Sequence, residues 1–252
     1  MRDTVLVTGA GTGIGKAIAQ VLADRNHSLI LLGRNRENLE NTRGSLKNPE
    51  NHKSFSCDIR HPEAIKKALQ ESGTDSLYAV VANAGLGGEN RYGNGDRWQE
   101  IVDINLTGSY NTVQESLPYL KKSVRQCRKI LFISSILARL GVPGYSAYCA
   151  SKAGLLGLMR SLAAELARDK IQVNAICPGW VNTAMAHEGL QAFADTLNIS
   201  REEAFKNAMS DVPLGKMSEP EEIARLVSFM LEERENSITG QTIDINNGAI
   251  MP

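Results

Sequence analysis

The chain has 252 residues, of which 28 are basic and 28 acidic, so its formal net charge is zero. A balanced charge gives no overall attraction to nucleic acid or to an anionic membrane. No apolar run approaches the ~20 residues that span a bilayer, and the first predicted strand starts too early to leave room for a secretory signal. We therefore expect a soluble, cytoplasmic protein whose partners include neither nucleic acid nor membrane.

Cysteine and histidine residues are few and scattered. The four cysteines form no C-x-x-C pair, and four in a chain of this length do not make a disulfide framework. The four histidines show no metal-ligand spacing, either among themselves or with the cysteines. We therefore expect reduced thiols and no metal site. The residues concerned are Cys57, Cys127, Cys149, Cys177, His27, His52, His61 and His187.

Short apolar segments alternate with helical patterns along the whole chain. This alternation predicts an α/β fold in a single domain over residues 1–252, a doubly wound parallel sheet of about seven strands with helices on both faces. The predicted strands are residues 5–7, 28–32, 53–57, 77–82, 129–133, 171–177 and 242–245.

A glycine-rich turn follows the first strand. Apolar residues recur at helical spacing from Ile14 to about Asp24, so the glycines lie between a buried strand and a helix N-terminus. Free backbone N–H groups and the helix dipole favour an anion at such a point. Two phosphate-binding patterns fail here. The last glycine of G-x-G-x-x-G, counted from Gly9, falls on Ile14, and the lysine of a P-loop, Lys16, is followed by alanine.

The pattern that fits is T-G-x-x-x-G-x-G. It resembles the turn of the short-chain dehydrogenase/reductase family, which has a Rossmann-type fold, and the resemblance implies that the turn holds the pyrophosphate of NAD(P). A tight turn without a ligand is the alternative, and the glycines alone do not decide between the two. By the resemblance, the cofactor contacts of the turn are Thr8, Gly9, Gly11, Thr12, Gly13, Ile14 and Gly15.

The end of the second strand bears on which nicotinamide cofactor is used. In dinucleotide folds an acidic residue there accepts the ribose 2′-hydroxyl of NAD, whereas a basic one accommodates the 2′-phosphate of NADP. Gly33 stands in the place of the acid, and Arg34 follows it. We therefore predict NADP(H) in preference to NAD(H), with both residues in the site. The alternative is that Arg34 and Arg36 are the solvated start of the next helix, where arginine opposes the helix dipole.

The third and fourth strands end in further residues that match the family. Asp58 and Ile59 follow the third strand as an acidic and aliphatic pair, which the resemblance implies contacts the adenine ring. The fourth strand ends in A-N-A-G, which resembles the N-N-A-G of the family with its first asparagine replaced. We expect Asn83 to brace the sheet, while Ala84 and Gly85 let the cofactor lie close.

A loop and a long predicted helix come next. Residues 86–95 are rich in glycine and predict a mobile loop, followed by a helix from about residue 96. Asn105 in that helix matches the catalytic asparagine of the family, which by the resemblance holds a water that resupplies protons; an exposed helical asparagine is the alternative. Farther on, basic residues share one helical face, either as a solvated helix end or as a docking patch for an acidic carrier protein. They are Lys121, Lys122, Arg125 and Arg128.

Tyr148 and Lys152 are four residues apart on a predicted helix, so both project from one face. We expect the ammonium group to lower the pKa of the tyrosine from its usual ~10, so that it can exchange a proton with a carbonyl or an alcohol. Y-x-A-S-K, Ser135 after the fifth strand, and Asn105 occur in family order and resemble its catalytic tetrad. By that resemblance Ser135 orients the carbonyl, Tyr148 transfers the proton and Lys152 binds the nicotinamide ribose. Ser135 is preferred to Ser134 because its spacing to Tyr148 matches the family.

The sixth strand ends in P-G-x-V-x-T, which matches the family segment whose threonine grips the nicotinamide carboxamide. The resemblance implies cofactor contacts by Pro178, Gly179, Val181 and Thr183. The helix that carries Tyr148 is apolar nearly all round as far as about residue 168, so one face needs cover beyond the sheet. We therefore predict a subunit interface on this helix and a homo-oligomer, either a dimer or a tetramer.

Residues 183–215 form the predicted substrate loop, the part in which the family varies. The length of this loop and its E-E-A-F segment at 202–205 resemble β-ketoacyl and polyketide ketoreductases, whereas N-N-G at 246–248 departs from the usual D-G-G. The leading hypothesis is an oxidoreductase that uses NADPH to reduce a 3-oxoacyl thioester, on acyl carrier protein or coenzyme A, to the 3-hydroxyacyl product. The alternatives are an NAD(P)-dependent dehydrogenase of a secondary alcohol, hydroxy acid or sugar, and a regulator that binds NADP(H) without turnover.

Overall fold

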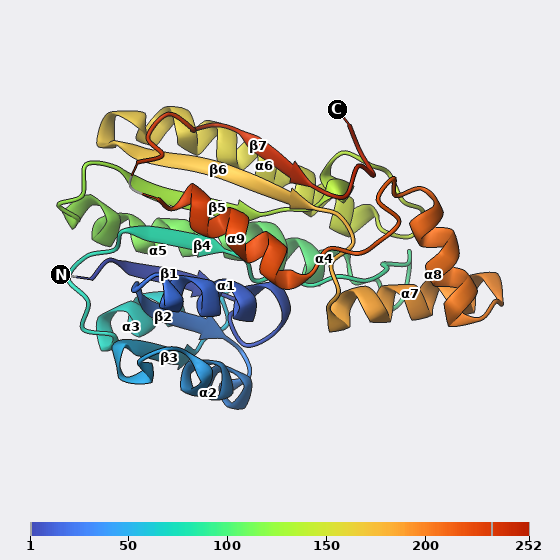
Figure 1. Ribbon diagram of the computed structural model, residues 1–252, viewed down its shortest axis with the longest axis horizontal. Coiled ribbons are helices and arrows are strands. Elements are labelled where there is room, and N and C mark those ends of the chain that lie inside the picture. Colours follow the sequence, from blue (N-terminus) through green and yellow to red (C-terminus); the bar gives the residue numbers. More distant parts are fainter. Residues whose placement is uncertain (1, 233, 252) are drawn as a thin grey trace.

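The fold is an open, twisted parallel sheet with helices on both faces (Figure 1). The computed structural model describes residues 2–232 and 234–251, and within these ranges seven strands pair in the order β3-β2-β1-β4-β5-β6-β7. Each of these pairings is parallel, which confirms the predicted fold class. The strands are β1 (Thr4–Thr8), β2 (Ser28–Gly33), β3 (His52–Ser56), β4 (Ala79–Ala82), β5 (Arg128–Ile133), β6 (Ile171–Pro178) and β7 (Thr242–Ile245).

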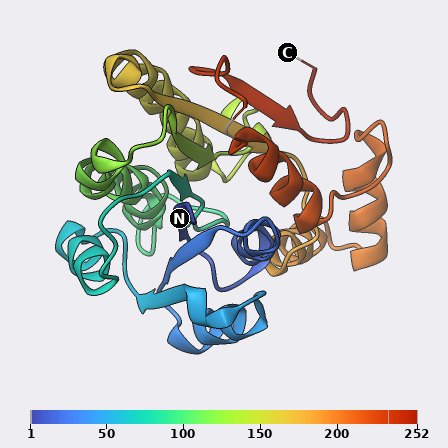
Figure 2. The ribbon, with the colours of Figure 1, turned by 60° about the vertical axis from the view of Figure 1, so that its left-hand side comes forward.

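Two sets of helices sandwich the sheet. One face is covered by α3, α5 and α6, and the other by α1, α2 and α9 (Figure 2). Among the helices of the described chain, none combines the length and the apolar character that a membrane span requires. The helices are α1 (Gly13–Asp24), α2 (Arg36–Ser45), α3 (Pro62–Glu71), α4 (Trp98–Val102), α5 (Gly108–Lys122), α6 (Ser146–Leu166), α7 (Ala184–Leu197), α8 (Arg201–Ser210) and α9 (Pro220–Met230).

Strand β1 shows why the sequence of a central strand is apolar throughout. Val5 and Val7 point into the core beneath α1 and α9, whereas Leu6 points into the core beneath α3, α5 and α6. All three side chains are fully buried. Because successive side chains in a strand point to opposite faces, a strand covered on both sides needs apolar residues at every position.

The topology places a crevice at the carboxyl end of β1. Leu6 pairs with Ile30 of β2 on one side and with Val80 of β4 on the other. The chain continues from β1 toward β2 and β3, then returns across the sheet to β4. Connections therefore diverge between β1 and β4, and ligands of open α/β sheets bind at such a switch point.

Helices α7 and α8 form a lobe that extends beyond the carboxyl ends of the strands (Figure 1, right). The lobe has a small apolar cluster of its own, built from Leu190, Met209, Val212 and Met217. The turn after β7 holds the end of this lobe, because Asn247 Nδ2 donates to Lys216 O (3.0 Å) and Ser218 Oγ (3.1 Å).

Asn247 also accounts for the departure from the D-G-G pattern. Its φ angle is +56°, in the left-handed region that favours glycine but that asparagine tolerates best among residues with a side chain. Asparagine therefore keeps the backbone conformation of the turn and adds the two bonds to the lobe.

The predicted strand boundaries differ from the structure by one residue in β1, β2, β3, β5 and β6, and by two residues in β4. Strand β3 begins and ends one residue earlier than predicted, and β4 begins at Ala79 rather than residue 77. The helix predicted from residue 96 starts at Trp98 as the short α4 and passes through a π-helical turn, Asp103–Thr107, into α5. The loop at 86–95 contains neither helix nor strand, and its Asn90 is buried.

Candidate active site

A cavity of ≈ 340 Å³ lies at the switch point, along the carboxyl ends of β1 to β5. Among the described residues, no group of three histidine, cysteine, aspartate or glutamate side chains could hold a metal ion. Six predicted site residues lie outside the lining of the cavity, namely Thr8, Asn105, Ser135, Pro178, Gly179 and Val181. The predicted residues that line it are Gly9, Gly11, Thr12, Gly13, Ile14, Gly15, Gly33, Arg34, Asp58, Ile59, Asn83, Ala84, Gly85, Tyr148, Lys152 and Thr183.

The glycine turn forms one wall of the cavity. Gly9 and Gly13 have φ angles of +65° and +51°, which side chains rarely allow. A Cβ on Gly15 would lie 2.1 Å from the carbonyl oxygen of Gly9 and 2.5 Å from Asn83 Nδ2. At the N-cap of α1, Thr12 makes no side-chain hydrogen bond, and the first turn of the helix contains no acid. The N-terminal N–H groups and the dipole of α1 therefore favour an anion here.

Thr8 does not line the cavity, but it holds two residues that do. Its side chain is buried, and Oγ1 accepts hydrogen bonds from the backbone N–H groups of Asn83 and Ala84, each at 3.0 Å. Asn83 Nδ2 donates in return to the carbonyl oxygens of Thr8 (3.0 Å) and Gly9 (3.3 Å). These bonds join the ends of β1 and β4, so Asn83 braces the sheet as predicted. Thr8 therefore positions Asn83 and Ala84, which line the crevice.

Arg34 lies between the end of β2 and the start of α2. The N-cap of α2 is Asn35, whose side chain accepts from Asn38 N at 2.9 Å, so Arg36 is the first helical residue. Arg34 is exposed, precedes the cap and lines the cavity. Its position outside the helix favours a role in the site over the alternative of a solvated helix start.

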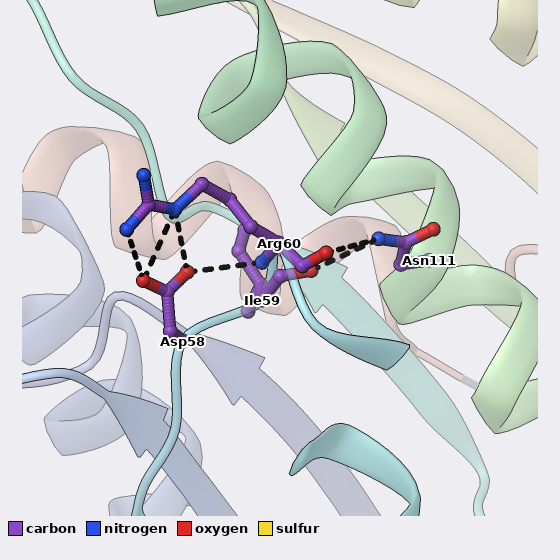
Figure 3. Close-up of polar contacts among 4 residues, drawn as sticks. All are labelled: Asp58, Ile59, Arg60 and Asn111. Carbon is purple, nitrogen blue, oxygen red and sulfur yellow. Dashed lines mark hydrogen bonds and ion pairs between the residues drawn. The ribbon is translucent and has the colours of Figure 1, made fainter. Parts of the chain in front are cut away.

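Asp58 lines the cavity after β3 and is held by a neighbour on its own loop (Figure 3). Arg60 donates to both carboxylate oxygens, from Nε at 3.0 and 3.1 Å and from Nη2 at 2.6 Å. These bonds lower the pKa of Asp58 to about 2. Asn111 on α5 donates from Nδ2 to the carbonyl oxygens of Ile59 and Arg60, each at 3.2 Å. Asn111 of α5 therefore holds the backbone of the loop, and the Asp58 carboxylate is ionised at neutral pH.

Tyr148 and Lys152 project from the start of α6 into the cavity. Lys152 is only 4% exposed; its Nζ donates to Ile133 O at 2.9 Å and lies 5.6 Å from the centroid of the Tyr148 ring. Burial raises the pKa of Tyr148 to about 12, although a hydrogen bond to Ser135 opposes the rise, and burial lowers the pKa of Lys152 to about 8. The prediction that Lys152 lowers the pKa of Tyr148 is therefore wrong for this structure. The ammonium lies over the ring and is bonded to Ile133, and burial outweighs its charge.

The two serines after β5 have separate partners. The Ser135 hydroxyl acts on Tyr148 and opposes the rise in its pKa, and Ser135 Oγ accepts from Leu137 N at 3.1 Å, which starts a 3₁₀ turn, Ile136–Ala138. Ser134 lines the cavity and donates from Oγ to Lys152 O at 2.9 Å. The contact with Tyr148 agrees with the choice of Ser135, while Ser134 fixes the backbone of α6.

Asn105 is fully buried in the π-helical turn between α4 and α5. Its Oδ1 accepts from Leu86 N at 2.7 Å, and its Nδ2 donates to Leu86 O and Ser151 Oγ, each at 3.0 Å. Gly85 separates this amide from the lysine, since a Cβ there would lie 3.2 Å from Asn105 Oδ1 and 3.3 Å from Lys152 Nζ. Asn105 thus ties the loop after β4 to α6, in a π-bulge of the kind found at functional sites.

Thr183 is the N-cap of α7, the first helix of the lobe. Its Oγ1 accepts from Ala186 N (3.4 Å) and lies 3.2 Å from Val181 O, to which it donates. Thr183 lines the cavity opposite Gly13, where an added Cβ would meet the Thr183 methyl group at 3.3 Å. Gly179 packs instead against Asn246, and Val181 is buried. These two residues and Pro178 therefore shape the turn after β6.

Sequence reasoning missed nine lining residues. Two of them, Ile133 and Ser134, end β5, and the rule that ligands bind at the carboxyl ends of strands could have found them. Met185 contacts the loop across the cavity, where a Cβ on Gly87 would lie 2.9 Å from its sulfur, and no short motif predicts such a contact. The nine are Asn35, Asn38, Leu39, Cys57, Ile104, Ile133, Ser134, Ala184 and Met185.

Comparison with known proteins places this fold and site in a family. The family model described as "Enoyl-(Acyl carrier protein) reductase" matches residues 9–249. Relatives named 3-oxoacyl-[acyl-carrier-protein] reductase FabG are 34% identical in Rickettsia prowazekii (98% of this chain and 97% of the relative) and 32% in Aquifex aeolicus (96% and 95%). The chain belongs to the short-chain dehydrogenase/reductase family and is an oxidoreductase.

Solved structures share the whole fold. An actinorhodin polyketide ketoreductase variant with NADPH aligns with a TM-score of 0.92 and 30% identity, over 98% of this chain and 97% of that chain. The Pseudomonas aeruginosa RhlG/NADP active-site complex aligns with a TM-score of 0.86 and 26% identity, over 98% and 96%. The likeness covers the lobe of α7 and α8 as well as the sheet.

Proposed function

We propose that this protein uses NADPH to reduce the carbonyl group of a 3-oxoacyl thioester, carried on acyl carrier protein or coenzyme A, to the 3-hydroxyacyl product. The observation that carries the proposal is geometric: Tyr148 and Lys152, one helical turn apart on α6, line the same crevice as the glycine turn and Arg34. Burial raises the pKa of Tyr148, so the phenol is protonated at neutral pH. A protonated acid in this position suits reduction of a carbonyl. The 3-oxoacyl class is supported by the names of the relatives and by the likeness to a polyketide ketoreductase.

The residues of the crevice fit NADPH. The glycine turn has no side chains in the way of a pyrophosphate, and the N-terminus of α1 favours its charge. Arg34 offers a guanidinium to a 2′-phosphate at the end of β2, and Thr183 offers polar contacts to a carboxamide at the opposite end. When bound, the cofactor supplies a hydride. In this proposal the nicotinamide end of the crevice, beside Thr183 and Tyr148, is the reactive one.

The chain's own residues then handle the proton. Tyr148 gives its hydroxyl proton to the carbonyl oxygen as negative charge develops there, and Ser135 donates a hydrogen bond to the same oxygen. Lys152, with a pKa of about 8, is mostly protonated at neutral pH and offsets the charge of the phenolate that forms. Ile133 O keeps the ammonium in place during this step.

The four basic residues predicted to share one helical face do not lie on one helix: α5 ends at Lys122, Arg125 follows the helix, and Arg128 begins β5. Lys121 pairs with Asp169 (2.7 Å), and Lys122 lies over the Tyr119 ring (5.8 Å). The remaining two residues are engaged as well: Arg125 pairs with Asp3 at 2.6 Å, and Arg128 donates to backbone carbonyls. Because each of the four has a partner within the chain and they share no helical face, they do not support a docking patch for an acidic carrier protein.

We also propose that the protein is a homo-oligomer, a dimer or a tetramer, assembled on α6. Most large apolar side chains of this helix are buried within the chain and Leu158 is half-buried, whereas the small residues Ala150, Ala153 and Gly157 are exposed. Small residues allow a second copy to approach closely. Sedimentation at micromolar concentration tests this proposal, and a monomer would contradict it.

Steady-state assays test the substrate and the cofactor together. Acetoacetyl-coenzyme A and an acetoacetyl carrier protein should be reduced with NADPH in clear preference to NADH. Crotonyl-coenzyme A, a matched enoyl thioester, should not be reduced. Inert acetoacetyl thioesters, together with turnover of a free ketone, hydroxy acid or sugar, would favour the dehydrogenase alternative.

The variant Tyr148→Phe separates an enzyme from a regulator. It should lower kcat by about 100-fold or more, because it removes the proton donor, and leave the NADPH dissociation constant within about twofold. Fluorescence titration of NADPH measures the second quantity. Undiminished activity in the variant would overturn the mechanism, whereas tight NADPH binding without turnover of any carbonyl by the wild type would favour the regulator.

A further inference from the structure

The helix that carries Tyr148 lacks a cap of its own. Helix α6 begins at Ser146, and its N-cap residue, Tyr145, makes no side-chain hydrogen bond. Asn90 takes this role from the loop between β4 and α4: its Oδ1 accepts from Ala147 N at 2.9 Å and lies 3.2 Å from Ser146 Oγ. Tyr148 is the next residue along the helix. We propose that Asn90 is a positioning residue that caps α6 and thereby holds Tyr148 in place, an inference that rests on the proposed role of Tyr148 as proton donor.

The surroundings of Asn90 fix which end of its amide faces the helix. The side chain is 6% exposed, and Nδ2 donates to Asp96 Oδ1 at 3.2 Å and to Ser146 Oγ at 3.1 Å. The Ser146 hydroxyl can bond either end of the amide, but Ala147 N can donate only to the amide oxygen. Asp96 Oδ1 also accepts from Trp98 N at 3.0 Å, which holds the carboxylate at the start of α4. The backbone N–H of Asn90 donates to Gly144 O at 2.8 Å. The amide oxygen is therefore left to accept from α6, as an N-cap requires.

A second anchor holds the helix on the other side of the tyrosine. Asn105 bonds both Leu86 and Ser151, and Ser151 Oγ donates to Tyr148 O at 2.8 Å. The loop after β4 is thus linked to α6 in two places: Leu86 is linked through Asn105 to Ser151, which follows Tyr148, and Asn90 bonds Ser146 and Ala147, which precede it. Without the near anchor the first turn of α6, which has unpaired N–H groups, is free to fray. Fraying displaces the phenol, and a misplacement of ~1 Å at a reacting group lowers a rate by as much as ~10²-fold.

The test compares Asn90→Ala with Asn174→Ala. Asn174 is also a buried asparagine, and neither of its side-chain bonds reaches α6. Its Oδ1 accepts from Gln241 N (3.0 Å), and its Nδ2 donates to Ile238 O (2.8 Å). Asn90→Ala should lower kcat by about 10- to 100-fold, with the NADPH dissociation constant changed by less than about twofold. Asn174→Ala should leave kcat per folded molecule unchanged. Equal kcat values for Asn90→Ala and the wild type would overturn the proposal.

A rescue by charge exchange makes the test specific to the cap. In N90D alone, a carboxylate faces Asp96 at hydrogen-bonding distance, so the loop is repelled and kcat should fall. In N90D/D96N, the carboxylate at position 90 still accepts from Ala147 N, and the amide at position 96 supplies the missing donor. A negative charge at a helix N-terminus is also favourable. The double variant should therefore recover most of the wild-type kcat, and a folded double variant as slow as N90D would overturn the proposal.

Hydrogen exchange tests the cap without reference to turnover. In Asn90→Ala the amides of Ala147 and Tyr148 should exchange about tenfold faster or more, while those of β6 stay protected. In N90D/D96N protection at the two amides should return. If these changes are seen but no thioester is reduced by the wild type, the proposed substrate is wrong and the cap stands; unchanged exchange would overturn the cap itself.

Discussion

Replacing Lys152 with methionine should stabilise the protein at neutral pH while it removes a proposed catalytic group. Burial lowers the pKa of this lysine from 10.5 to about 8. At ~1.4 kcal/mol for each pKa unit, the protonated lysine destabilises the folded state by roughly 3 kcal/mol below pH 8. Methionine gives up the bond to Ile133 O, and a buried carbonyl that loses its donor costs ~1 kcal/mol or more. The expected net gain in the free energy of unfolding is about 2 kcal/mol.

The gain should vary with pH in one direction. Between pH 8 and 10.5 the unfolded chain keeps a proton on Lys152 that the folded chain has lost, so the stability of the wild type rises with pH. The penalty is complete below pH 8 and disappears near pH 10.5. The advantage of Lys152→Met should therefore shrink from about 2 kcal/mol at pH 7 to nothing or a small loss by pH 10.

Urea unfolding of the cofactor-free proteins at pH 7, 8, 9 and 10 measures this difference. The control is Lys206→Met, because Lys206 is an exposed lysine on α8 and its replacement should have a small effect that does not vary with pH. A Lys152→Met difference that stays constant from pH 7 to 10 would refute the reasoning, as would destabilisation at pH 7.

Three further variants test the cofactor crevice. Gly15→Ala places a methyl group 2.1 Å from Gly9 O, so it should abolish NADPH binding in a fluorescence titration and lower the melting temperature. Gly44→Ala is the control: position 44 has open space around it, and alanine there should raise the free energy of unfolding by ~0.5–1 kcal/mol. Arg34→Glu should raise KM for NADPH by about tenfold or more and favour NADH in steady-state assays; an unchanged preference would contradict the assignment of the 2′-phosphate. Arg60→Gln should raise the pKa of the Asp58 carboxyl from about 2 toward 3.8 in an NMR titration. In the wild type the depressed pKa contributes stability that is present above about pH 4 and is lost as the pH falls toward 2, and this contribution should disappear in the variant. An unchanged titration of Asp58 would contradict the role of the ion pair.

The sheet could be predicted because its central strands are buried on both faces. A run such as residues 5–7 contains no polar residue, and the same holds for β4. Strands β5 and β6 are buried as well, although Lys129, Gln172 and Asn174 are polar. Strand β3 lies at the edge, where its residues His52 to Ser56 are partly exposed, so the pattern that marks its ends is weaker. The π-helical turn around Asn105 had no local signal, since it depends on bonds to Leu86 and Ser151.

The site could be predicted as far as residue spacing specifies it. Tyr148 and Lys152 face one cavity because four residues make about one helical turn. The pKa of Tyr148 could not be predicted in the same way, because it depends on what covers the phenol, and that cover comes from distant parts of the chain. Asn90 gave no signal either: it is one polar residue in a glycine-rich loop, and the N–H group that it caps lies 57 residues farther along.

Tyr148 and Lys152 together set the pH dependence of the proposed proton transfer. Oxidation of an alcohol needs phenolate as the base, and a pKa of about 12 leaves a phenolate fraction of roughly 10⁻⁵ at pH 7. Reduction needs the phenol, which is fully present, and a protonated Lys152 to offset the phenolate that forms. The rate of carbonyl reduction should therefore be constant from pH 6 to about 7.5 and fall above pH 8, as the lysine loses its charge. Single-turnover reduction measured from pH 6 to 9.5 tests this, and a rate that rises through pH 8 would mean that the neutral lysine, not the ammonium, supports the proton transfer.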